Sequence, residues 1–84
     1  MAGKQLVGTV VHFFPKIGVA IVTLTAELSV GDNVAVEGHG EGFEQKVESM
    51  QMEHAEVKSA RSGDSVGIKA SQAVREGAKV YKIV

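Results

Sequence analysis

The stretch SVGDNVAV, residues 29–36, shows the pattern from which the fold can be predicted. Close copies follow as RSGDSVGI at 61–68 and REGAKVYKI at 75–83, each with a glycine, a small or acidic residue, and then alternating apolar residues. Glycine adopts backbone angles that other residues avoid, and an Asp side chain can accept bonds from nearby amides, so each copy is typical of a turn that leads into a strand. We therefore interpret Gly31–Asp32 and Gly63–Asp64 as structural turns rather than as chemistry.

Apolar residues recur at every second position along most of the chain, which is the period of a β-strand. FPKIG at 14–18 is predicted to be a turn or bend, because Pro15 cannot donate to a strand ladder and Gly18 can take a positive φ. A bulge near Glu48 or Ser49 is expected, because the apolar residues there change from odd to even positions. The six predicted strands occupy residues 5–13, 19–24, 33–37, 43–52, 66–68 and 80–84.

This spacing of short strands predicts one all-β domain over residues 1–84, a small closed or nearly closed six-stranded antiparallel β-barrel. Helix is expected only as single turns, in AEVKSARSG and ASQAVREGA. The chain begins with Met and ends in the apolar run VYKIV, which fits a complete small protein, although an excised domain would fit as well.

Composition excludes several classes of function. The absence of cysteine rules out disulfides, thiolate metal sites and a cysteine nucleophile. A net charge of −1 is unlike the strong positive excess of an avid nonspecific nucleic-acid binder. The N-terminal segment lacks the features of a signal peptide, and no apolar run is long enough for a membrane helix, so we expect a cytoplasmic protein without a membrane partner.

Motifs for catalysis and cofactors are missing from the sequence. His12, His39 and His54 are far apart and lack the helical spacing of a metal site, and no serine lies in a G-x-S-x-G elbow. The chain has no G-x-x-x-x-G-K-[ST] loop for phosphates, and GHGEGF at 38–43 lacks the helix and lysine that such a loop needs. We therefore predict no enzyme activity, no cofactor, no metal and no GTP binding.

The order of the turn and strand pieces resembles a known family. GTVV, LSVGDNVAVEG, VESMQMEH, ARSGDSVGIK and VREGAKVYK, in this order, resemble the second domain of translational GTPases, the β-barrel that follows the nucleotide-binding domain in elongation factor Tu. The resemblance extends from about Val7 to Val84. It implies a translation-factor barrel that stands alone, without the GTPase domain.

In that family the barrel holds the aminoacylated end of tRNA and contacts the ribosome. The resemblance therefore implies that the chain binds RNA, either tRNA or rRNA, or a translation-machinery protein. Gln51 and His54 align with a Glu and an Arg of the family, and a histidine replaces a permanently charged phosphate partner at the second position. The alternative is a protein–protein interaction module or obligate subunit that docks to a partner enzyme or GTPase and has no nucleic-acid role.

Basic and aromatic residues supply the candidate contacts for either partner. Barrel closure would bring basic residues of the second half onto one face beside Gln51 and His54; scattered solubilising charge would explain them equally. Phe13 and Phe14 are adjacent, so strand alternation forces one of them off the core, where an exposed ring such as Phe14 could stack on a base or fill a pocket. The predicted RNA-binding or partner-binding residues are Lys46, Gln51, His54, Lys58, Arg61, Lys69, Arg75 and Phe14.

Overall fold

The computed structural model describes residues 3–38, 41–53 and 55–83, and these residues form antiparallel strands and turns without a helix. The all-β prediction is therefore confirmed. No helix of a length and hydropathy suited to crossing a membrane occurs in these ranges. The strands are β1 (Lys4–Phe14), β2 (Val19–Leu24), β3 (Leu28–Ser29), β4 (Asn33–Gly38), β5 (Glu41–Lys46), β6 (Met50–Met52), β7 (Ala55–Val57), β8 (Ser59–Ala60), β9 (Ser65–Lys69) and β10 (Lys79–Ile83).

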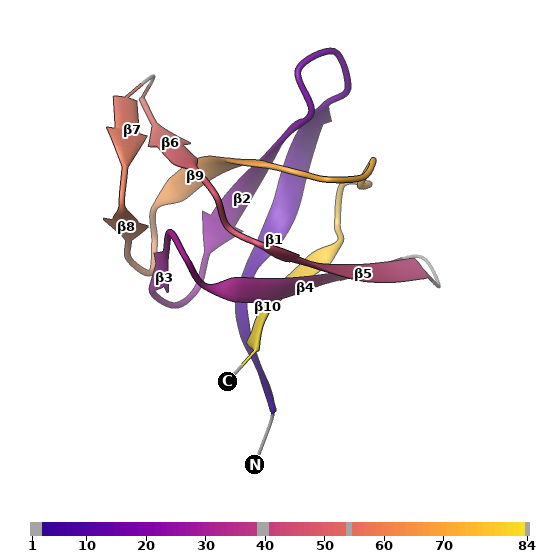
Figure 1. Cartoon of the computed structure of the whole chain (residues 1–84), viewed down its shortest axis with the longest axis horizontal. Helices are drawn as coiled ribbons and strands as arrows, with labels where there is room; N and C mark the ends of the chain where they lie inside the picture. Colours follow the sequence, from indigo (N-terminus) through magenta and orange to yellow (C-terminus); the bar gives the residue numbers. More distant parts are fainter. Residues whose placement is uncertain (1–2, 39–40, 54, 84) are drawn as a thin grey trace.

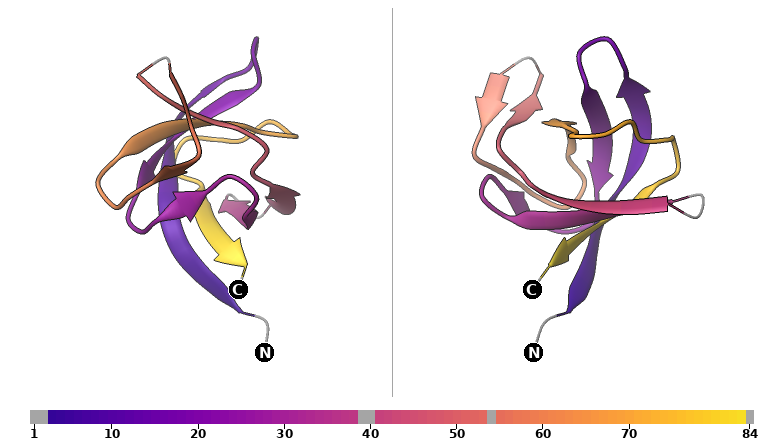
Figure 2. Two further views of the ribbon diagram at one scale, coloured as in Figure 1. Left: turned by 60° about the vertical axis from the view of Figure 1, so that its left-hand side comes forward. Right: turned by 45° about the vertical axis from the view of Figure 1, so that its right-hand side comes forward.

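Eight of these strands form one strongly curved sheet in the order β5-β4-β10-β1-β2-β9-β6-β7, and β3 pairs with β8 in a separate small sheet (Figure 1). The large sheet is not closed, because β5 and β7 lie at its two edges. The prediction of a closed or nearly closed six-stranded barrel is therefore wrong in strand number, since the sheet has eight strands and is not closed. Figure 2 shows how the sheet wraps around its core while the β1–β2 hairpin projects from one end, away from the start of β1.

The segment predicted as one strand over 43–52 is divided into β5 and β6, and the bulge expected near Glu48 does not join them. The division occurs where Val47 leaves the ladder and bonds to the turn before β4. Its N–H donates to the carbonyl of Asp32 at 2.8 Å, and its carbonyl accepts from the N–H of Gly31 at 2.8 Å. Val47 is thereby buried at 1% exposure, so the change of apolar phase comes from a change of partner.

β1 contains two bulges that decide which of its side chains face the core. It pairs with β10 from Lys4 to Thr9 and with β2 from Gly8 to Phe14, and the register shifts once in each pairing, at Val7 and at Val11. A bulge adds one residue to a strand, so the side-chain alternation changes phase there. After the shift at Val11, Phe13 packs against the core and Phe14 points outward.

The repeated glycine motif forms the same turn three times, at residues 29–32, 61–64 and 75–78, which we call the three glycine turns. In each, the fourth residue donates its N–H to the carbonyl of the first at 3.1 Å, and the glycine has a φ of 92–99°. This is the geometry of a type II turn, which favours glycine at its third position. The prediction that Gly31–Asp32 and Gly63–Asp64 are structural turns is confirmed.

Each glycine turn also makes two backbone bonds to one residue of a distant segment. Gly31 and Asp32 bond to Val47, Gly63 and Asp64 bond to Leu24, and Gly77 and Ala78 bond to Val10, at 2.7–2.9 Å. Val10, Leu24 and Val47 are each buried at 1% exposure. The repeated motif therefore attaches loops to the core at three separate points, which explains its repetition in so short a chain.

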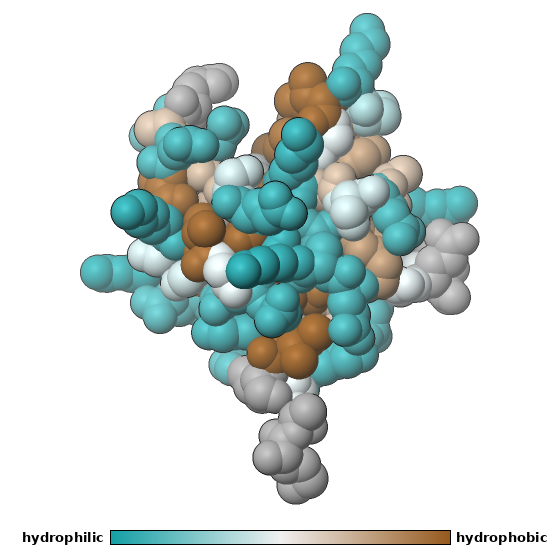
Figure 3. Space-filling model, in the orientation of Figure 1, coloured by the Kyte–Doolittle hydropathy of each residue, from teal (hydrophilic) through white to brown (hydrophobic). Residues whose placement is uncertain are grey.

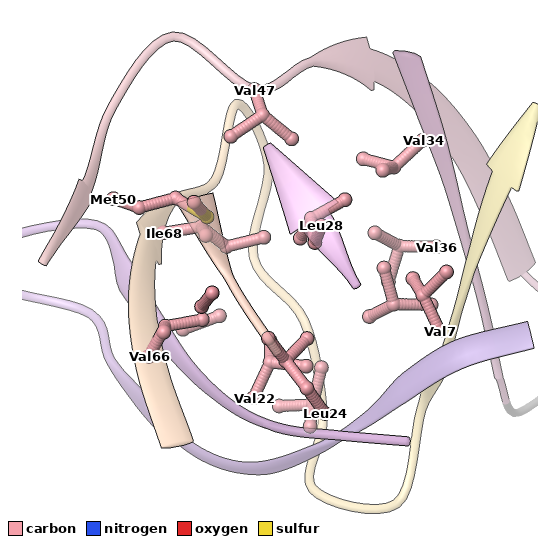
Figure 4. Close-up of a cluster of buried hydrophobic side chains, with 14 of the residues drawn as sticks. Val7, Val22, Leu24, Leu28, Val34, Val36, Val47, Met50, Val66 and Ile68 are labelled. Atoms are coloured by element: carbon pink, nitrogen blue, oxygen red, sulfur yellow. The ribbon is translucent and has the colours of Figure 1, made fainter. Parts of the chain in front are cut away.

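The core is aliphatic, and among the described residues no polar or charged side chain is buried. Burying one Val, Leu, Ile or Met side chain contributes roughly 1.5–3 kcal/mol, so the twelve such residues in the buried cluster provide the main driving force for folding. Met50 is buried and Met52 packs against the cluster. Figure 4 shows the side chains that converge between the strands, including Val7, Val22, Leu24, Leu28, Val34, Val36, Val66 and Ile68.

Candidate functional site

The most exposed apolar side chains lie at the β1–β2 hairpin. Val11, Phe14 and Ile17 are 47%, 42% and 63% exposed, and we call these three residues the hairpin patch. Of the large apolar side chains that are exposed in the described chain, only Leu6 and Val30 lie elsewhere. Figure 3 shows hydrophobic residues at the tip of the molecule where the β1–β2 loop projects in Figure 1. Clustered exposed apolar residues with a polar border are typical of an interaction site.

The hairpin is held by bonds on both sides of its turn. The carbonyl of Phe14 accepts from the N–H groups of Ile17 at 3.3 Å and Gly18 at 2.8 Å, and Gly18 has a φ of 66°. The carbonyl of Gly18 in turn accepts from the N–H of Ala70 at 2.8 Å. These bonds fix the direction in which the exposed side chains project.

His12 contacts Phe14 at the base of the hairpin patch. The ring of His12 lies 4.4 Å from the ring of Phe14 in an edge-to-face arrangement. Its Nδ1 is 2.9 Å from Oε2 of Glu76, which belongs to the third glycine turn. Phe14 is thus supported by a contact that reaches from β1 to the loop before β10.

Strand register extends this surface across the outer face of the sheet. Phe14 lies opposite Val19, which lies opposite Lys69, and His12 lies in the neighbouring row with Ile21. Ile21 is followed across the sheet by Gly67 and then Gln51. Gly67 has no side chain, which leaves this part of the face low. A Cβ there would lie only 3.0 Å from Cγ1 of Val19.

The structure brings together only part of the predicted site. Phe14, Gln51 and Lys69 share the outer face just described, and Lys46 joins Lys69 around a separate hollow of about 270 Å³. The other basic residues do not extend this group: Lys58 lies between β7 and β8, Arg61 begins the second glycine turn, and Arg75 begins the third. His54, like His39, lies outside the described residues.

Gln45 anchors the hollow beside Lys46 and Lys69. Its Nε2 donates to the carbonyl of Lys69 at 2.7 Å, and its Oε1 accepts from the N–H of Ser71 at 2.7 Å. One side-chain amide therefore imitates a strand pairing between β5 and the end of β9. Since both polar ends of this amide are satisfied, its arrangement is explained by structure.

A larger open hollow of about 600 Å³ lies over β4 and β5, and the sequence interpretation missed it. Ala35 and two glycines form its floor, and Lys4 donates to Glu37 at its rim. The hydrogen bond to Glu37, together with the charge of that carboxylate, raises the pKa of Lys4 above its ordinary value. The only signal in the sequence was the small-residue content around Gly38 and Gly42.

Charged side chains among the described residues form ion pairs at the surface. No three His, Asp or Glu side chains gather there in a way that could hold a metal ion. The side-chain ion pairs, Lys4–Glu37, His12–Glu76 and Lys82–Asp32, join groups that retain contact with solvent. What distinguishes this surface is an ordered set of exposed apolar groups with a charged border.

Comparison with known proteins relates this fold to peptidases. No protein-family model matches the chain. An uncharacterised protease of Methanocaldococcus jannaschii is 41% identical over 79 residues, which are 93% of this chain and 19% of that protein. The chain therefore spans about a fifth of the length of the curated relative that it matches.

Solved structures point the same way. A crystal structure of the C-terminal domain of a Geobacillus thermoleovorans U32 peptidase has a TM-score of 0.87 and 26% identity, over 93% of this chain and 91% of that domain. This chain is similar to a U32 C-terminal domain. The selenomethionine form of the same domain gives a TM-score of 0.86 and 25% identity, over 90% of this chain and 96% of that one.

These findings overturn the resemblance to elongation factor Tu and the partners that it implied. The chain's neighbours are U32 C-terminal domains, so a translation-factor function, tRNA or rRNA binding and translation-machinery partners are wrong. The resemblance depended on Gly-Asp turns that lead into valine-rich strands. Backbone geometry favours these residues at type II turns in any small antiparallel sheet, so their order could not identify a family.

Proposed function

We propose that these 84 residues form one non-catalytic docking domain that attaches to the peptidase portion of a U32-type protein. The observation that carries the proposal is the match of 93% of this chain to 19% of a much longer protease. A unit of this kind accompanies a larger enzyme portion in that relative. The alternative predicted from the sequence, a module that docks to a partner enzyme, is close to this proposal. The main prediction, an RNA-binding barrel, is not.

The exposed surface supports a docking role over a catalytic one. A catalytic centre usually combines a nucleophile or acid–base pair within a concave, water-excluding site. The paired side chains here are exposed, and the ordered exposed groups are the apolar hairpin patch. A cytoplasmic location stays a prediction from the sequence.

The proposal is tested by titrating the 84-residue chain into the peptidase portion of the Methanocaldococcus jannaschii protein, produced without its matching region. We expect a saturable one-to-one interaction by calorimetry, with the fold of both components checked by circular dichroism. Peptide and casein hydrolysis by the 84-residue chain alone is measured in parallel, and we expect none.

Two results would contradict the proposal. Absence of any interaction between the two folded components would remove the docking role. Peptide hydrolysis by the 84-residue chain that a single Ser, His or Glu substitution abolishes would make the domain an enzyme.

A further inference from the structure

The hairpin patch lies at the opposite end of β1 from the place where the strand begins. β1 runs for 11 residues from Lys4 to Phe14, and a strand rises about 3.3 Å per residue, so its ends are roughly 33 Å apart. Figure 1 shows the hairpin at the top of the molecule and the start of β1 at the bottom. In the Geobacillus protein the matching domain is C-terminal, so the peptidase portion precedes the equivalent of β1.

A bulge produces this patch, and folding alone does not require it. The register shift at Val11 leaves Val11 and His12 both exposed and turns Phe14 outward. Without the extra residue, alternation would have pointed Phe14 toward the core and Phe13 toward solvent. The bulge thus adds Phe14 to the exposed Val11, and the turn adds Ile17.

The patch is ordered before any partner binds. The carbonyl of Phe14 holds two N–H groups of the turn, Gly18 is bonded to Ala70, and the ring of His12 contacts the ring of Phe14. A surface held in its bound shape loses little conformational entropy on association. This arrangement favours insertion into a complementary pocket over a loose, adaptable contact.

The charges that border the patch are mostly positive. Lys16 lies between Phe14 and Ile17 in the turn, and Lys69 lies across β2 from Phe14. The third glycine turn adds the carboxylate of Glu76, which faces His12. Charged borders steer association toward a partner of opposite sign, which here means an acidic one.

We propose that the hairpin patch inserts into an apolar pocket with an acidic rim on the peptidase portion of a U32-type protein. The inference rests on the proposed function and names the surface that performs it. Most of the Methanocaldococcus protein lies outside the matching 19%, so a large surface in the same polypeptide is available for this contact. Contact at the hairpin, together with the chain connection at the start of β1, holds such a domain at both ends.

The test uses a chimera in which the 84-residue chain replaces the matching region of the Methanocaldococcus protein. Hydrogen exchange is followed by mass spectrometry in the chimera and in the 84-residue chain alone. We expect exchange over residues 11–18 to be slower in the chimera by at least about tenfold, since docking excludes water from the centre of an interface. Exchange in the core strands reports in both samples whether the chain is folded.

Ile17→Asp is the test variant, because Ile17 is 63% exposed and its loss leaves the core intact. Its matched control is Val30→Asp, which places the same charge at an exposed apolar residue in the first glycine turn. Ile17→Asp should remove the protection of residues 11–18, whereas Val30→Asp should retain it. Lys16→Glu should weaken the protection, and the effect should shrink as salt concentration rises.

The outcomes separate this inference from the proposed function. Protection that appears only on another face of the domain overturns the hairpin inference and leaves the docking function standing. Protection of 11–18 that Ile17→Asp does not reduce also overturns it. A folded chimera without added protection anywhere overturns both proposals.

Discussion

The three glycine turns and the β1–β2 hairpin turn use glycine in the same way but differ in what their side chains do. The second and third glycine turns place small or polar residues outside, whereas the first also exposes Val30, and each of the three makes two backbone bonds to a buried residue of a distant segment. The hairpin turn has one long-range backbone bond, from Ala70 to Gly18, and it exposes Phe14 and Ile17. A turn can stabilise the fold without exposing apolar side chains. The exposed apolar side chains of the hairpin therefore have to be explained by another role.

The third glycine turn differs from the other two in a way that packing explains. Asp32 and Asp64 accept the N–H of the first residue of their turns, but the corresponding residue of the third turn is Ala78. Ala78 is buried, and a Cβ on Gly38 would lie 2.9 Å from its Cα. No space remains for a carboxylate at this turn.

The largest expected effect comes from making the third turn match the others. Ala78→Asp places a carboxylate against the backbone of Gly38, and an unpaired buried charge costs about 3–5 kcal/mol. Urea unfolding followed by circular dichroism measures the loss. Ala73→Asp, at an exposed position of the same loop, is the control and should change stability little. Equal losses for the two variants would contradict the packing explanation.

Gly63→Ala should have the next largest effect. A Cβ at this position meets nothing within 4 Å, so the cost comes only from the φ of 93°, at about 1–2 kcal/mol. Thermal unfolding provides the measurement, and Ser62→Ala in the same turn is the matched control. An unchanged unfolding temperature for Gly63→Ala would show that the turn is not held at positive φ.

Asp64→Ala removes the side-chain bond that Asp64 accepts from the N–H of Arg61 at 3.0 Å. A net loss of about 0.5–1.5 kcal/mol is expected for one such bond. Asp64→Asn retains an acceptor oxygen and should restore part of the stability in the same urea measurement. If the asparagine variant is no more stable than the alanine variant, the bond does not stabilise the turn.

Lys4→Gln tests an ion pair that belongs to neither kind of turn. Because pairing with Glu37 raises the pKa of Lys4, its contribution to stability is fully present below the ordinary lysine pKa and is lost as pH rises through the raised value. The wild type should therefore be slightly more stable than Lys4→Gln at pH 8, and the difference should vanish at strongly alkaline pH. A difference that grows at alkaline pH would contradict the assignment.

Ile17→Asp should have the smallest effect on stability, within about 0.5 kcal/mol, because exposed side chains contribute little to folding. Urea unfolding of the 84-residue chain measures it, with Val30→Asp as the matched control. A loss of more than 1.4 kcal/mol, a factor of ten in the unfolding equilibrium, would mean that the hairpin patch supports the fold.

Local features of the fold could be predicted from the sequence, but the pairing of distant strands could not. Glycine at a positive φ is recognisable in Gly31, Gly63 and Gly77, and adjacent Phe13 and Phe14 required that one ring leave the core. The central position of β10 between β4 and β1, and the bonding of Val47 to the first glycine turn, depend on long-range register. No local pattern in the sequence specifies them.

The candidate site was predictable to a similar extent. Phe14 was identified from alternation alone, and it lies in the hairpin patch. The bulge at Val11 was not foreseen, because the apolar run of β1 reads equally well in either phase. Lys58, Arg61 and Arg75 were expected to share one basic face, but the strand order places them on separate segments. Whether any of them contacts a partner stays a prediction.

The most direct test of the central claim measures two properties on the same two variants. Unfolding free energy and affinity for the Methanocaldococcus peptidase portion are determined for Asp64→Ala, in a glycine turn, and Ile17→Asp, in the hairpin patch. We predict that Asp64→Ala is less stable and docks normally, whereas Ile17→Asp is as stable as the wild type and docks at least about tenfold more weakly. Loss of affinity in both variants, or in neither, would contradict the claim that the glycine turns stabilise the fold and the hairpin turn binds the peptidase portion.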